Sequence, residues 1–76
     1  MPKRYQPREL NLVLEHLGWR QTRQRGRHAI LTKAGAYRNI AVPMSSREVS
    51  IGTFYSILKT ASLTREDFDN MAEEVL

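Results

Sequence analysis

The 76-residue sequence contains no cysteine, and this absence excludes disulfide bonds, thiolate metal sites and cysteine nucleophiles. No apolar run approaches the ~20 residues that a membrane-spanning helix needs. The first residues are basic, and the chain is charged again at Arg8 and Glu9, so it has no signal-peptide core. We therefore expect a cytoplasmic protein without a membrane partner, since a reducing compartment suits a chain without cysteine.

Most common catalytic motifs are also missing. The four glycines are scattered and build no phosphate-binding loop, and no serine is flanked by glycines as in a nucleophile elbow. The two histidines, His16 and His28, fall in different predicted elements, and no carboxylate lies near His28 in the sequence. Metal ligands usually cluster, so we expect neither a metal site nor a cofactor.

Acidic residues are scarce in most of the chain, which makes its charge uneven. Residues 1–60 hold eleven Lys or Arg and three Asp or Glu, a balance of +8, whereas residues 61–76 carry −4. Between Arg20 and Arg38 lie five Arg, one Lys and no acid. Such a patch attracts polyanions, and RNA or DNA is the first candidate. The alternative is a solvated basic strand face that binds nothing.

The apolar residues predict helices before and after a short segment of strands in the sequence. Residues at i, i+3, i+4 and i+7 form one stripe in 7–17 and another in 52–61, and Thr64 resembles the cap of a further helix. Between these helices, turn signals separate three candidate strands, at 19–25, 27–33 and 37–42.

This order predicts an α+β fold. We expect a two-layer sandwich in one domain over residues 1–76, with a short tail at 1–6. Its three-stranded antiparallel sheet would carry the helices on one face and leave the other face free.

One histidine lies inside a basic segment, from Arg23 to His28. Imidazole, with an ordinary pKa of ~6.5, suits proton transfer near neutral pH, and arginines hold phosphates and stabilise their developing charge. His28 is therefore a candidate general base for RNA cleavage, although it could be an ordinary strand histidine. Gly26 would shape the turn that presents it. The candidates for RNA binding are Arg23, Arg25, Gly26, Arg27 and Lys33.

Three other aromatic residues have two interpretations each. Trp19 follows the first predicted helix and is either a core anchor or a platform on which a base stacks. Tyr37 and Tyr55 could also stack on bases, and a packing role is the alternative for both.

Five segments, in order and at matching spacing, carry a family resemblance: Leu17–Trp19, Arg23–His28, Ile40–Pro43, Gly52–Lys59 and Leu63–Phe68. The pattern that they form with the first helix runs from about Leu10 to Phe68, a span of more than three-quarters of the chain. Together they resemble the HicA family of bacterial toxins, which are messenger-RNA interferases of type II toxin–antitoxin systems.

The resemblance implies a fold like that of double-stranded-RNA-binding domains, in the order α-β-β-β-α, here with an added C-terminal helix. It also implies that His28 matches the family's essential histidine. A HicB-like antitoxin would bind and inhibit the chain in a hetero-oligomer, and DNA would be contacted only through that antitoxin. The toxin alone would be a monomer. Arg27 stands where the family has serine, and Ser45 stands where it often has histidine.

The sequence therefore predicts a toxin that acts as a metal-independent endoribonuclease on messenger RNA, with His28 as the single general base. It would leave a 2′,3′-cyclic phosphate or the product of its hydrolysis. Two alternatives stay open. One is a non-catalytic RNA-binding module of the same fold, and the other is an inactive toxin that only binds its antitoxin.

Overall fold

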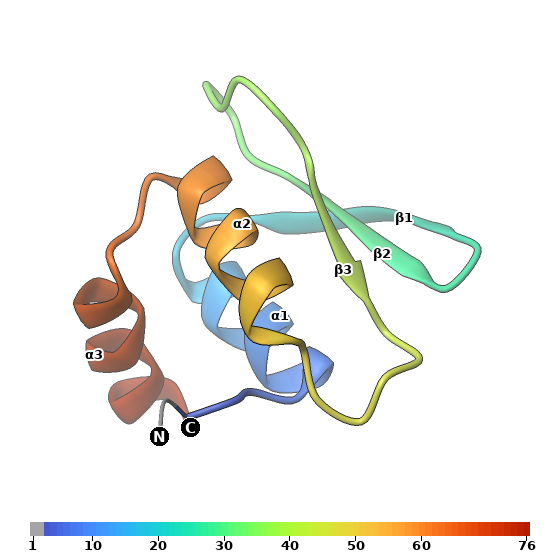
Figure 1. The fold of residues 1–76 in the computed structure, drawn as a ribbon. Helices are drawn as coiled ribbons and strands as arrows, with labels where there is room; N and C mark the ends of the chain where they lie inside the picture. The colour runs from blue at the N-terminus through green and yellow to red at the C-terminus, as the bar shows by residue number, and fades with distance from the viewer. Residues whose placement is uncertain (1–2) are drawn as a thin grey trace.

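The computed structural model describes residues 3–76 and confirms the predicted α+β architecture. The elements follow one another as α1 (Pro7–His16), β1 (Arg20–Arg25), β2 (His28–Thr32), β3 (Ile40–Pro43), α2 (Ile51–Ala61) and α3 (Arg65–Val75). The strands form one antiparallel sheet in the order β1-β2-β3. Figure 1 shows the three helices gathered on one side of this sheet. Within residues 3–76, every helix is too short or too polar to cross a membrane.

The helices begin and end where local chemistry dictates. Pro7 occupies the first turn of α1, where its missing N–H costs little, and the Glu9 carboxylate accepts the N–H of Gln6 at 2.9 Å. The helix ends at His16, one residue before the predicted boundary, and the chain turns through Gly18 with a φ of 100°. A glycine adopts this left-handed conformation without strain. Thr64 caps α3, as its sequence position predicts.

The third strand is shorter than predicted. The sequence indicated a strand over residues 37–42, but β3 begins only at Ile40, which pairs with Leu31 of β2. A turn intervenes, in which the N–H of Ala36 donates to the Lys33 carbonyl at 3.0 Å and Gly35 has a φ of 81°. This turn takes the chain out of the ladder, so residues 33–39 form a loop.

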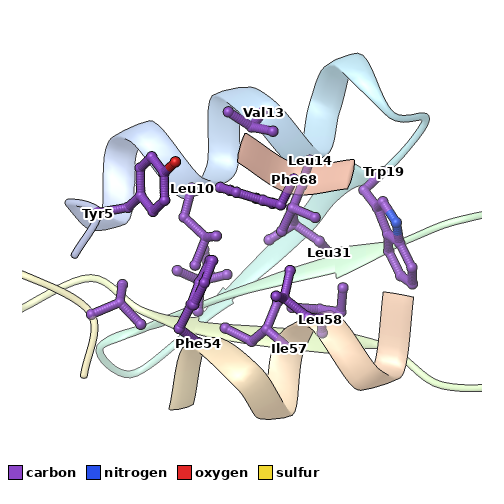
Figure 2. Packing of buried hydrophobic residues seen from close by; sticks show 14 of the residues in the cluster. Tyr5, Leu10, Val13, Leu14, Trp19, Leu31, Phe54, Ile57, Leu58 and Phe68 are labelled. Atoms are coloured by element: carbon purple, nitrogen blue, oxygen red, sulfur yellow. The ribbon is translucent and has the colours of Figure 1, made fainter. Parts of the chain in front are cut away.

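The core lies between the helices and one face of the sheet (Figure 2). Each fully buried aliphatic or aromatic side chain there contributes about 1.5–3 kcal/mol to folding. Trp19 is 2% exposed and therefore belongs to the core, which rules out a stacking platform at this position. The largest fully buried side chains are those of Phe54, Phe68, Leu10, Leu14, Leu31, Val13, Val42 and Val49.

The predicted tail at residues 1–6 is wrong at Tyr5, which is 3% exposed. Its ring lies 4.9 Å from the Phe68 ring and 5.6 Å from the Phe54 ring, between centroids. Its hydroxyl donates a 2.6 Å hydrogen bond to Asp69 of α3. A single aromatic residue among charged ones has no periodicity, so the sequence could not indicate this anchor. The first two residues lie outside the described part of the chain.

Candidate functional site

The strand register places His28 and two of the predicted RNA-binding arginines on one face. Arg25 pairs with His28, and Arg23 pairs with Ile30. Directly paired residues of an antiparallel sheet point to the same face, and successive residues alternate. Ala29 lies between His28 and Ile30 in sequence and belongs to the buried core. Arg23, Arg25 and His28 therefore lie on the opposite face, which we call the open face.

A β-bulge in β1 makes this arrangement possible. Gln21 pairs with Leu31, whereas Arg23 pairs with the next residue, Ile30, so Thr22 is an extra residue in β1. In a regular strand, alternation from Arg20 would put Arg23 and Arg25 on the core side. The bulge shifts the alternation by one residue and brings both arginines to the open face.

Arg20 is a residue that sequence reasoning missed. It pairs with Thr32, which lies two positions beyond Ile30 and therefore also on the open face. Its side chain is exposed, and it extends the row formed by Arg23 and Arg25 along β1. The only sequence signal was its place in the basic run. The bulge that puts Arg20 on the same face as Arg23 and Arg25 cannot be recognised from the spacing of residues in the sequence.

A two-residue turn joins the ends of β1 and β2. Gly26 has a φ of 58°, and Arg27 is not among the residues with positive φ. Glycine at the first position with positive φ is the pattern of a type II′ hairpin turn. The carbonyl of Arg27 accepts the N–H of Met44 at 2.8 Å, which ties the turn to the end of β3. Ser45, where the resemblance led us to expect a histidine, follows Met44 and therefore adjoins this turn.

The open face is positively charged, and within residues 3–76 no salt bridge neutralises its arginines. Arg23, Arg25, Arg27 and His28 are all exposed. Among residues 3–76, the only salt bridge joins Arg65 and Asp69 within α3. In the same part of the chain, no three His, Cys, Asp or Glu side chains come together in a way that could hold a metal. Unpaired cations around an accessible imidazole can bind a phosphodiester and place a base beside it.

The structure does not bring Lys33 into this group. Its Cε lies 3.1 Å from the point that a Cβ on Gly18 would occupy, so its side chain covers the end of α1. His16 is also separate, because it lies exposed in the last turn of α1. The candidate site therefore consists of His28, the β1 arginines and the turn at Gly26 and Arg27.

Comparison with known proteins identifies the family. A search of curated proteins found no match. A sequence model of the family described as "HicA toxin of bacterial toxin-antitoxin" matches residues 7–63, about three-quarters of the chain. This range contains α1, the whole sheet and α2, and thus every residue of the open face. The chain therefore belongs to the HicA family of toxins of bacterial toxin–antitoxin systems.

Proposed function

We propose that this toxin is an endoribonuclease that cuts messenger RNA with His28 as the general base. The observation that carries the proposal is the register, in which His28 lies directly opposite Arg25 and on the same exposed face as Arg23. Cross-strand partners of this kind have Cα atoms about 5.5 Å apart, so one phosphodiester can contact both side chains.

The reaction follows from the chemistry of these groups. The neutral imidazole of His28 takes the proton of a ribose 2′-hydroxyl, and the 2′-oxygen attacks the adjacent phosphorus. The bond from phosphorus to the 5′-oxygen breaks, and the departing oxygen takes a proton from water. The products are a 2′,3′-cyclic phosphate and a 5′-hydroxyl end. Arg23 and Arg25 stabilise the negative charge that develops on the phosphorane oxygens.

A single histidine makes this a slow enzyme. General base catalysis contributes roughly 10²–10⁴ in rate, and arginines add electrostatic stabilisation of the transition state. Ser45 supplies no imidazole at the position where relatives often have one, so no second histidine protonates the leaving oxygen. Arg27 adds a cation beside His28 in place of a serine hydroxyl.

The proposed protein partner is a HicB-like antitoxin that covers the open face. Three arginines of β1 lie on this face, and no carboxylate follows Glu15 until Glu48. An inhibitor that blocks the site must therefore present acidic or hydrogen-bonding groups to it. Inhibition of RNA cleavage by the separately purified antitoxin tests this part of the proposal.

The direct experiment compares two histidine variants on a long single-stranded RNA in excess EDTA. His28→Ala removes the proposed base, and His16→Ala removes an exposed histidine on another element. We expect cleavage by the wild type and by His16→Ala, and none by His28→Ala. Equal cleavage by all three proteins would show that His28 is not the base. RNA binding without cleavage by a folded wild type would favour a binding module.

A further inference from the structure

Tyr37 is exposed to an extent that folding does not explain. It lies in the loop of residues 33–39, and 94% of its surface is accessible. Large aromatic side chains normally stabilise a protein by burying their rings, as Tyr5 does here. The packing role that the sequence left open for Tyr37 is therefore excluded. Its ring has one close cationic neighbour, the Arg38 guanidinium, 5.8 Å from the ring centroid.

The surroundings of Tyr37 are cationic and rich in hydroxyl groups. A hollow of about 560 Å³ lies between this loop and the C-terminal end of α2, a size within the range of small-ligand sites. It is lined by Tyr37, Arg38, Ser56, Lys59, Thr60 and Ser62. No carboxylate is among these residues. Along the chain, the nearest acids lie outside this set: Glu48 is eight residues before Ser56, and Glu66 is four residues after Ser62.

This combination of groups fits a nucleotide. An exposed aromatic ring offers a face on which any base can stack, and arginine planes extend such stacks. Lys59 and Arg38 supply positive charge for the phosphate, while the hydroxyls of Ser56 and Thr60 can bond to the sugar. The carbonyl groups at the end of α2 repel an anion only weakly, because two of them already accept hydrogen bonds from the N–H groups of Ser62 and Leu63.

The hollow lies at the far end of the sheet from the proposed catalytic group. His28 begins β2, next to the short turn from β1, whereas the loop with Tyr37 follows the other end of this strand (Figure 1). Five residues of strand separate His28 from Lys33, which corresponds to about 17 Å. A nucleotide bound at Tyr37 is therefore several nucleotides away from a phosphodiester bound at His28.

We propose that Tyr37, Arg38 and Lys59 form a second RNA-binding subsite that stacks one unpaired base at a distance from the cleaved bond. This subsite rests on the proposed ribonuclease function and adds to it a preference for RNA long enough to reach both places. The Tyr37 ring holds the base, and the two cations hold the adjoining phosphates.

The test measures RNA binding in the His28→Ala background, in which RNA stays intact, by fluorescence anisotropy. Tyr37→Ala should weaken binding of a long single-stranded RNA by roughly 5- to 150-fold, the effect of losing one base–aromatic stack. Tyr37→Phe keeps the ring and should bind within about twofold of the parent, since stacking needs no hydroxyl. A trinucleotide cannot span both places, so it should bind the parent more weakly than the long RNA does.

The controls separate this subsite from the proposed function. Arg8→Ala removes an exposed cation from α1, and we expect it to weaken binding less than Lys59→Ala does. The thermal unfolding midpoint of Tyr37→Ala should equal that of its parent, because the side chain is exposed. Unchanged binding of long RNA by Tyr37→Ala would overturn the subsite while wild-type cleavage still supports the ribonuclease. Absence of both binding and cleavage in the wild type would overturn both proposals.

Discussion

Exchanging one arginine across the two faces of β1 tests whether its position or only its charge matters. Arg25 lies on the open face opposite His28, and Gln24 is its neighbour on the other face, paired with Ala29. The double variant Gln24→Arg, Arg25→Gln keeps the formal net charge of +4. It moves one guanidinium from the side of His28 to the opposite side of the sheet.

The expected loss follows from the contact that disappears. A hydrogen bond to a charged group contributes about 1.5–3 kcal/mol, which corresponds to roughly 10- to 150-fold in kcat/KM. Long-range attraction of RNA depends on net charge and should stay the same. Both positions are exposed, so the free energy of unfolding should change by less than about 0.5 kcal/mol. The side chain of Gln24 makes two exposed hydrogen bonds: it donates to the Gly26 carbonyl and accepts from the Gln21 amide.

The assay follows cleavage of a long RNA at several salt concentrations for the wild type, the double variant and the single variant Arg25→Gln. We expect the double variant to be as impaired as Arg25→Gln at every salt concentration. Activity of the double variant within about twofold of the wild type would refute the reasoning, because it would show that net charge alone is sufficient.

Three further predictions concern the free energy of unfolding, measured by urea denaturation. Burial and the hydrogen bond to Asp69 raise the pKa of Tyr5 from 10.0 to about 12. The stabilisation that this protonated hydroxyl gives the folded state is therefore complete below pH 10 and is lost as the pH rises to about 12. Tyr5→Phe should reduce that loss, and equal pH curves for both proteins would contradict this. Ser62 ends α2 with a φ of 58°, so Ser62→Gly should stabilise the chain by roughly 0.5–1 kcal/mol, and destabilisation would show that the strain is absent. Asn11 is 7% exposed, and its Oδ1 has no hydrogen-bond partner. Asn11→Leu should therefore stabilise the folded chain by about 1 kcal/mol, whereas a decrease in the free energy of unfolding would show that the amide is needed.

The helices and the basic first hairpin could be predicted because local patterns determine them. Apolar residues at helical spacing indicated α1 and α2 to within one residue at each end, and Thr64 indicated the start of α3. The basic run and His28 indicated a polyanion site at the first hairpin, and the structure places Arg23, Arg25 and His28 on one face. These features depend on residues close together in the chain.

The remaining features depend on residues far apart in the chain or on backbone detail. The bulge at Thr22 decides which face Arg23 and Arg25 occupy, and no periodicity reveals it. Lys33 belongs to the same basic run, but its side chain packs at Gly18, which only the tertiary structure shows. Tyr5 contacts α3, whose residues lie at the other end of the sequence, so its burial could not be predicted from its sequence neighbours.

The most direct test of the central claim uses an RNA in which one nucleotide at a mapped cleavage position carries a 2′-deoxyribose. If His28 activates a 2′-hydroxyl, cleavage should stop at that position and continue elsewhere, and the products should end in 2′,3′-cyclic phosphates or their hydrolysis products. His28→Ala should cut neither RNA. Continued cleavage at the deoxyribose position, with 3′-hydroxyl ends, would contradict the account.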